Sequence, residues 1–372
     1  MPPVNLLIKP ASSLCNMKCN YCFYIDESEK RCQSSYGLMT DKTLKNVIRK
    51  GVLYAKGACT IAFQGGEPTL SGLDFFKRMV HYVKQYNKNN IKISYALQTN
   101  GYGINEEWCE FFHKHNFLIG LSVDGTEAIH DMYRHTSDGK GTYQRILKTA
   151  ELFDRYHIDY NILTVVHREV AENITDIYME YKKKGWKYLQ FIACLDSLGE
   201  ERGKDEYSLL PEAYGKFMIR LFDLWYQDFL QGEQPYIRQF ENYIAIQMGY
   251  LPESCEQCGV CTVQHVVEAD GSVYPCDFYV LDAYNLGNLN QVSMKDIQSR
   301  REKVNFIQRS VSIPKECENC QWKTLCKGGC YRNRDGLSHN YFCESYRMFF
   351  GACYEKMRII TGMLSKRKKE MN

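Results

Sequence analysis

The chain of 372 residues lacks the features that would assign it to a membrane or to nucleic acid. No run of apolar residues is long enough to span a bilayer, and no signal peptide precedes the opening Met1-Pro2-Pro3. The 47 Lys and Arg residues nearly balance the 44 Asp and Glu residues, so the net charge is only +3. Such a balance gives no electrostatic reason to expect nucleic acid as a partner. We therefore expect a cytoplasmic protein that binds neither membranes nor nucleic acid.

Cysteine, in contrast, is abundant, with 17 residues. In the absence of a secretion signal, this number argues against a disulfide-bonded scaffold and for metal ligands in a reducing compartment. A chain this rich in cysteine suits an anaerobic organism. The length allows two domains and a large core, and no internal repeat or low-complexity segment interrupts it.

The first half of the chain alternates short apolar runs with helical patterns. We predict strands at 4–9, 60–64, 91–98, 117–122, 160–166 and 188–194. We predict helices at about 40–56, 73–86, 106–115, 143–156 and 171–184. Six β/α units imply a parallel sheet with helices outside, and they are too few for a closed barrel of eight units. The predicted fold is therefore an α/β partial barrel of the TIM type, (β/α)6, open on one side.

The composition and the predicted secondary structure of the chain change after about residue 235. Before this point, residues 211–230 read as a bridging helix with one apolar face. Beyond it, cysteines become dense, predicted strands become short, and turns become frequent. We predict a domain boundary here, with residues 1–234 in the barrel and 235–372 in a cysteine-rich domain that ends in a helix.

Three cysteines lie close together near the start, in the stretch CNMKCNYC: Cys15, Cys19 and Cys22. Three thiolates can hold three irons of a four-iron cluster and leave the fourth iron open, whereas an electron-transfer cluster normally takes four cysteines. The alternatives are a zinc knuckle or chance thiols, although zinc prefers four ligands in two C-x2-C pairs. The spacing C-x3-C-x2-C, followed by Phe23 and Tyr24, resembles the signature of the radical S-adenosylmethionine (SAM) enzymes.

This resemblance implies a SAM site at the carboxyl ends of the strands, where barrel enzymes place their chemistry. In the family, a G-G-E segment meets the SAM amino group, which implies this role for Gly66 and Glu67. Ser122 and Arg134 resemble the contacts to the ribose and the carboxylate, with a surface ion pair as the alternative for Arg134. The remaining implied contacts are Tyr21 and Leu195 beside the adenine, Tyr24 stacked on a flat group or bonded to substrate, and Gln64 on the substrate backbone.

A second group of cysteines follows the predicted boundary. Its pattern is C-x9-G-x4-C from Cys261 to Cys276, then C-x2-C-x5-C-x3-C from Cys317 to Cys330. A hairpin at about 264–274, turning at Asp270-Gly271, is expected to bring Cys261 and Cys276 together. The pattern resembles the SPASM extension of peptide-modifying radical SAM enzymes.

The SPASM resemblance implies two auxiliary clusters, and so three [4Fe–4S] clusters in all. Their implied ligands are Cys255, Cys261, Cys276 and Cys330 for the first, and Cys317, Cys320, Cys326 and Cys343 for the second. Cys258 is an alternative to Cys255, and zinc is an alternative metal for one of these sites.

Nearly the whole chain resembles the anaerobic sulfatase-maturating enzymes. The segments LLIKPASSLCNMKCNYCFY, IAFQGGEPTLSG and CENCQWKTLCKGGCYRNRD are among those that carry the resemblance. In that family, a 5′-deoxyadenosyl radical starts the oxidation of a sulfatase cysteine or serine to Cα-formylglycine. The implied partners are a sulfatase polypeptide and a low-potential electron donor of the flavodoxin or ferredoxin type.

The resemblance also implies that Asp277, directly after Cys276, is the proton acceptor of this reaction; a structural salt bridge is the alternative. Two other functions stay open. One is a maturase that cross-links a small ribosomal peptide, which often carries an added N-terminal domain for which the strand beginning near Val4 leaves no room. The other is a non-catalytic iron–sulfur carrier or zinc scaffold.

Overall fold

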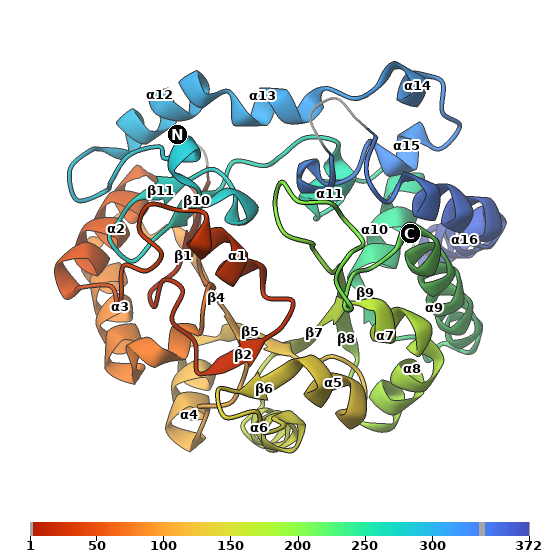
Figure 1. The fold of residues 1–372 in the computed structure, drawn as a ribbon, viewed down its shortest axis with the longest axis horizontal. Helices are drawn as coiled ribbons and strands as arrows, with labels where there is room; N and C mark the ends of the chain where they lie inside the picture. The colour runs from red at the N-terminus through yellow and green to blue at the C-terminus, as the bar shows by residue number, and fades with distance from the viewer. Residues whose placement is uncertain (1–2, 335–338, 372) are drawn as a thin grey trace.

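A single nine-stranded sheet forms the centre of the molecule in the computed structural model, which describes residues 3–334 and 339–371. The strand order is β11-β10-β1-β3-β4-β5-β7-β8-β9. Six strands that are neighbours in this sheet are parallel: β1 (Val4–Ile8), β3 (Ala58–Phe63), β4 (Lys92–Thr99), β5 (Phe117–Ser122), β7 (Tyr160–Val166) and β8 (Tyr188–Ala193). Figure 1 shows these strands as an arc with helices outside it. The predicted partial barrel is confirmed.

Amphipathic helices cover the outer face of this arc. They are α2 (Asp41–Tyr54), α3 (Leu73–Tyr86), α4 (Glu106–His115), α6 (Tyr143–Arg155) and α8 (Ile174–Lys183). In α2, Leu44, Val47 and Ile48 share one buried face, the spacing expected of a helix that packs against a sheet. The Thr40 side chain caps this helix by accepting a hydrogen bond from the Thr43 amide at 3.2 Å.

The helix predicted at about 171–184 is found, but its predicted start is wrong. The structure has two helices in this region, α7 (Arg168–Glu172) and α8, separated by Asn173. Asn173 has φ −111° and ψ 22°, outside the helical region, and its side-chain amide donates to the Glu169 carbonyl at 2.8 Å. This local bond replaces the helical conformation of the backbone at that point.

Three short strands from the second half of the chain extend the same sheet. On one side, β9 (Tyr236–Ile237) pairs with β8, and on the other, β10 (His265–Val267) pairs with β1. Strand β11 (Val273–Tyr274) pairs antiparallel with β10, which confirms the predicted hairpin. The predicted boundary between residues 234 and 235 falls between α9 (Pro211–Gln231) and β9, and it stays a prediction.

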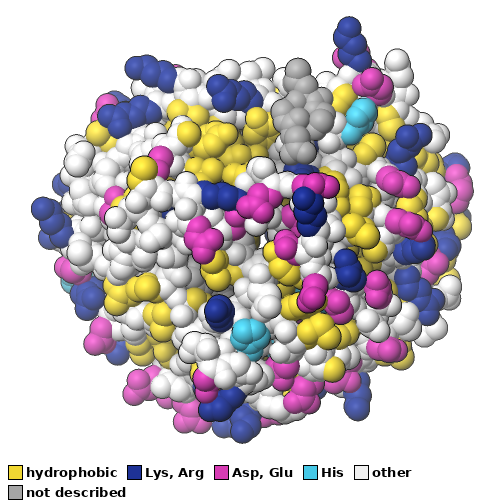
Figure 2. Space-filling model, viewed as in Figure 1, with side chains coloured by type: hydrophobic (Ala, Val, Ile, Leu, Met, Phe, Trp, Pro, Cys, Tyr) yellow, Lys and Arg dark blue, Asp and Glu magenta, His cyan; other side chains and the backbone are white. Residues whose placement is uncertain are grey.

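The remaining C-terminal elements are mostly short. They are α10 (Arg238–Gln247), α11 (Cys255–Cys258), α12 (Met294–Val304), α13 (Phe306–Val311), α14 (Lys315–Glu318), α15 (Lys323–Cys326) and the long α16 (Cys343–Met371). Helix α16 packs along α9 through ring contacts such as Phe222 with Phe349, 5.7 Å apart. Among residues 3–334 and 339–371, no helix combines the length and apolar character needed to cross a membrane. Figure 2 shows acidic and basic side chains interspersed over the viewed face, with several separate groups of apolar side chains between them, a large one of them near the upper centre.

Candidate active site at the carboxyl ends of the strands

Cys15, Cys19 and Cys22 line one cavity of about 170 Å³ at the carboxyl ends of the barrel strands. Cys19 ends the short strand β2 (Met17–Cys19), and Cys22 is the N-cap of α1 (Phe23–Glu29). Burial raises the pKa of Cys15 to about 11 and that of Cys19 to about 12. As free thiols these groups would be neutral near pH 7, so a metal cluster that needs thiolates would bind with release of protons. Three cysteine sulfurs that line one cavity fit such a cluster.

The segment Gly65-Gly66-Glu67 forms another wall of this cavity. Gly66 has φ +49°, and a Cβ at this position would lie 2.2 Å from the Leu14 carbonyl oxygen. The Glu67 amide donates to that same carbonyl at 2.8 Å. Only glycine permits this close approach, which fixes the G-G-E segment against the loop that leads into Cys15.

The Glu67 side chain is buried and accepts four hydrogen bonds. Its Oε1 accepts from the Thr69 amide at 3.0 Å, the Thr69 hydroxyl at 2.6 Å and the Thr99 hydroxyl at 2.8 Å. Its Oε2 accepts from the Asn100 amide at 2.8 Å. Burial nevertheless raises the pKa of Glu67. Glu67 lines the cavity, as predicted. Because it follows β3 and accepts hydrogen bonds from Thr99 and Asn100, it also connects the carboxyl ends of β3 and β4.

Arg134 faces the same cavity from β6 (Arg134–Thr136), whose partner strand is β2. The β-ladder places Arg134 directly opposite Cys19. Its Nη1 donates to the Tyr21 hydroxyl at 2.9 Å and lies 3.7 Å from Asp124 Oδ2, while Tyr21 donates to that same oxygen. Arg134 Nε is buried without a hydrogen-bond partner. A guanidinium fixed in this way, facing a cavity, suits a carboxylate ligand.

The other predicted SAM contacts also line this cavity. Ser122 accepts a hydrogen bond from the Gln98 side chain at 2.9 Å, and Leu195 lies at the end of β8. Tyr24 lines the cavity as well, but its hydroxyl donates to Asp277 at 2.6 Å. The structure therefore brings all seven predicted SAM contacts to one cavity: Tyr21, Tyr24, Gly66, Glu67, Ser122, Arg134 and Leu195.

Asp277 lies on the wall of a second, larger cavity of about 480 Å³ inside the barrel. Its Oδ2 accepts hydrogen bonds from Tyr24 at 2.6 Å and from the Gln64 side chain at 3.2 Å. Its Oδ1 is buried and has no hydrogen-bond partner. Burial raises the pKa of this carboxyl group. Gln64, Gln98 and Phe278 line both cavities, so the two cavities adjoin.

Four of the predicted auxiliary ligands line this second cavity: Cys255, Cys261, Cys276 and Cys330. Cys258 does not line it. Its thiol is directed instead toward the carbonyl oxygens of Pro252, at 3.6 Å, and Ser254, at 3.3 Å. The geometry favours Cys255 over Cys258 as the member of this set.

The last predicted set lies near the surface. Cys317, Cys320 and Cys343 line a third cavity of about 430 Å³, together with Trp322. Cys326 ends α15. Burial raises the pKa of its thiol to about 12, and the three neighbouring cysteines of this set also raise it. Within the described ranges, no group of three or more His, Cys, Asp or Glu side chains is placed to hold a single metal ion.

Comparisons with known proteins identify the family of the chain. Residues 10–180 match the Radical SAM superfamily, and residues 255–321 match the SPASM iron-sulfur cluster-binding domain. The cysteine-type anaerobic sulfatase-maturating enzyme of Clostridium perfringens strain 13 is 46% identical over 362 residues, covering 96% of this chain and 98% of that protein. The chain belongs to the anaerobic sulfatase-maturating enzymes.

Two further relatives of this sulfatase-maturating enzyme refine the comparison. The serine-type anaerobic sulfatase-maturating enzyme of Klebsiella pneumoniae is 31% identical, covering 96% of this chain and 89% of that protein. The solved structure of native anSMEcpe with bound AdoMet and Cp18Cys peptide has a TM-score of 0.93 and 44% identity, covering 98% of this chain and all of that one, 100%. The family is enzymatic, so the carrier and scaffold alternatives are set aside.

This sulfatase-maturating enzyme is thus a radical SAM oxidoreductase that uses [4Fe–4S] clusters and SAM. Sequence reasoning missed Lys9, Glu27 and Glu268, three buried charges close to Asp277. Lys9 ends a predicted strand and Glu27 lies within the short α1, so neither position shows a pattern that marks a functional charge.

Proposed function

We propose that this protein oxidises the side chain of a cysteine, within a sulfatase-derived polypeptide, to Cα-formylglycine. The cysteine-type assignment is supported by the 46% identity to a cysteine-type relative against 31% to a serine-type relative. The observation that carries the proposal is Asp277 Oδ1, a buried and unpaired carboxylate oxygen on the wall of the larger cysteine-lined cavity, which adjoins the SAM cavity.

The oxidation removes a hydrogen atom, a proton and an electron from the substrate, and the arrangement of the residues provides a different acceptor for each. When bound, a cluster and SAM at Cys15, Cys19 and Cys22 supply removal of a hydrogen atom from Cβ, and a cluster at the first auxiliary set supplies an acceptor for one electron. The chain itself contributes the base. Asp277 accepts the thiol proton at Oδ1, because Tyr24 and Gln64 occupy its other oxygen.

The substrate loses one hydrogen atom, one proton and one electron, which leaves a thioaldehyde. Water then hydrolyses the thioaldehyde to the aldehyde, and the sulfur leaves as hydrogen sulfide. Buried residues such as Arg134 and Glu67 line the SAM cavity, and such a lining limits the access of solvent to a reactive radical. The raised pKa of Asp277 matches the task, since a base works best when its pKa approaches the working pH.

The proposal extends to the setting of the enzyme. We propose that residues 1–234 hold the SAM site, and that residues 235–372 supply the ligands of two auxiliary clusters. A low-potential donor of the flavodoxin or ferredoxin type would reduce the first cluster. The cytoplasm is the proposed location, since eleven proposed thiolate ligands need reducing conditions to stay free.

Mass spectrometry of a peptide product tests this function. Protein purified and reconstituted without oxygen is incubated with SAM, a reductant and a sulfatase-derived peptide that carries one cysteine. We expect a loss of about 18 mass units, because sulfur and two hydrogens give way to one oxygen. A serine version of the peptide would lose about 2 mass units if it were also a substrate. An unchanged cysteine peptide, with clusters and SAM cleavage intact, would contradict the proposal.

A further inference from the structure

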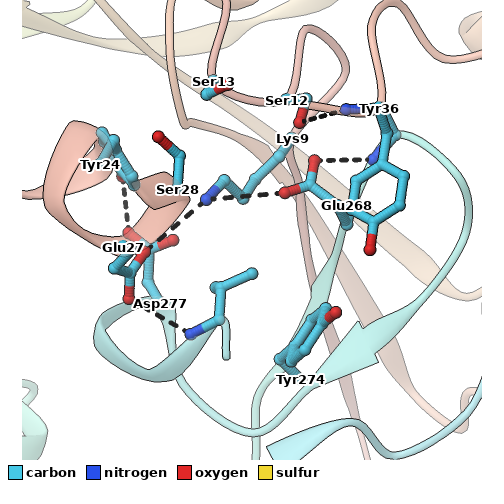
Figure 3. A network of polar contacts seen from close by, with 12 residues as sticks. Lys9, Ser12, Ser13, Tyr24, Glu27, Ser28, Tyr36, Glu268, Tyr274 and Asp277 are labelled. Carbon is cyan, nitrogen blue, oxygen red and sulfur yellow. Dashed lines mark hydrogen bonds and ion pairs between the residues drawn. The ribbon is translucent and has the colours of Figure 1, made fainter. Parts of the chain in front are cut away.

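A buried group of charged side chains lies close to Asp277. It consists of Lys9, Glu27, Arg31 and Glu268, and each of these side chains is at most 4% exposed. Lys9 Nζ lies 3.9 Å from Glu27 Oε2 and 3.9 Å from Glu268 Oε2, and Arg31 lies 2.5 Å from the same Glu268 oxygen. Figure 3 shows the Lys9 side chain reaching between Glu27 and Glu268, close to Asp277.

This group joins two elements that each begin at a proposed cluster ligand. Helix α1 starts at its N-cap Cys22, and the 3-10 turn η2 (Asp277–Tyr279) starts at its N-cap Cys276. The two elements touch in three ways. The Tyr24 hydroxyl donates to Asp277 at 2.6 Å, and the rings of Phe23 and Phe278 lie 5.0 Å apart. The third contact is made by Glu27.

Glu27 holds the end of the turn that carries Asp277. Its Oε1 accepts a hydrogen bond from the Val280 amide at 3.2 Å, one residue past η2. The contact is buried, so the amide has no water to replace it if the acceptor is lost. The position of Asp277 therefore depends on Glu27 as well as on Tyr24 and Gln64.

Lys9 fixes Glu27 and is itself tightly enclosed. A Cβ on Gly65 would lie 2.5 Å from Lys9 Cε, so the lysine stem runs directly against the G-G-E segment. Its ammonium also lies 4.6 Å from the centre of the Tyr24 ring, a cation–π distance. Lys9 thus contacts the G-G-E segment and α1 and, through Glu268, the hairpin formed by β10 and β11.

We propose that Glu27, held by Lys9, is a positioning residue that keeps Asp277 Oδ1 at the substrate thiol, an inference that rests on the proposed function. Loss of the Glu27 acceptor then leaves SAM cleavage intact and impairs the proton transfer that follows it. A displacement of about 1 Å at a reacting group can cost roughly 100-fold in rate. We expect the ratio of 5′-deoxyadenosine to formylglycine to rise about 10- to 100-fold.

Substitutions at Glu27 separate positioning from packing. Glu27→Leu removes the acceptor at similar size, whereas Glu27→Gln keeps it. Glutamine keeps a side-chain oxygen that can accept from the Val280 amide, so it is a close mimic of the acceptor that Glu27 provides. We expect Glu27→Gln to retain the wild-type product ratio and Glu27→Leu to raise it. Glu29→Leu, on the exposed side of the same helix, is the matched control and should leave the ratio unchanged.

Lys9→Met is a second, independent variant, because it removes the charge that holds Glu27 but keeps a stem of similar length. It should also raise the product ratio, with iron content near that of the wild type. Equal loss of deoxyadenosine and formylglycine, or loss of the clusters in both Glu27→Leu and Lys9→Met, would mean that the network serves folding alone and would overturn the inference. If the wild-type enzyme itself makes no formylglycine, the proposed function fails instead.

Discussion

Replacing Asp277 by asparagine is the sharpest perturbation of the proposed chemistry. The asparagine oxygen can take the place of Oδ2 and keep both hydrogen bonds, from Tyr24 at 2.6 Å and from Gln64 at 3.2 Å. The amide nitrogen then takes the place of the unpaired Oδ1 and presents a donor where the proton acceptor was. The variant therefore changes one function and preserves the surrounding contacts.

The magnitude follows from the role of the lost group. A positioned general base contributes roughly 100- to 10,000-fold to rate, or about 3 to 5 kcal/mol of activation free energy. We expect the rate of formylglycine formation in Asp277→Asn to fall within this range. The rate of 5′-deoxyadenosine formation should stay within about threefold of wild type, because the residues that line the SAM cavity are unchanged.

The assay measures both products in the same anaerobic reaction. Asp282→Asn is the matched control, since it makes the same change five residues further along at an exposed side chain. It should behave as the wild type does. Wild-type formylglycine yield from Asp277→Asn would remove Asp277 as the base, and a parallel loss of both products would show that the substitution damages SAM binding.

Three further predictions test other parts of the account. Cys258→Ser should keep about twelve irons per chain and Cys255→Ser should fall to about eight; the reverse pattern would make Cys258 the ligand. Tyr21→Phe removes the hydroxyl that bonds Arg134, so the KM for SAM should rise roughly tenfold with little change in kcat, and an unchanged KM refutes this role. Burial lowers the pKa of His265 from its unfolded value near 6.5 to about 4. The unfolded chain then binds the extra proton between these values, so stability is full above pH 6.5 and falls toward pH 4. Between pH 7.5 and 5.5 the wild type should lose about 1 kcal/mol more unfolding free energy than His265→Asn, and equal losses in the two proteins would count against a buried neutral histidine.

Local sequence patterns were enough to predict the barrel and the radical-SAM cysteines. The strands Phe117–Ser122 and Tyr160–Val166 have the predicted bounds, because each is a short apolar run that fills a buried strand. The three N-terminal cysteines lie within a short stretch of sequence, from Cys15 to Cys22, so their spacing alone brings them together. The misplaced start of the helix predicted at about 171–184 shows the limit of such patterns, since the Asn173 side chain competes with the helical backbone.

The surroundings of Asp277 could not be predicted in the same way. Tyr24 and Asp277 are 253 residues apart, and Glu27 and Val280 are equally distant in sequence. Contacts of this kind arise only when the hairpin of the second half pairs with β1, and no local periodicity reports that pairing. Buried charges such as Lys9 are also rare, so a lysine at the end of a predicted strand gives no sign that it is enclosed.

The central claim is that a radical formed at the SAM cavity takes hydrogen from the Cβ of a bound cysteine. A cysteine peptide deuterated at Cβ tests it most directly. The account predicts one deuterium transferred into 5′-deoxyadenosine for each formylglycine formed. Formylglycine produced together with deoxyadenosine that contains no deuterium would contradict it.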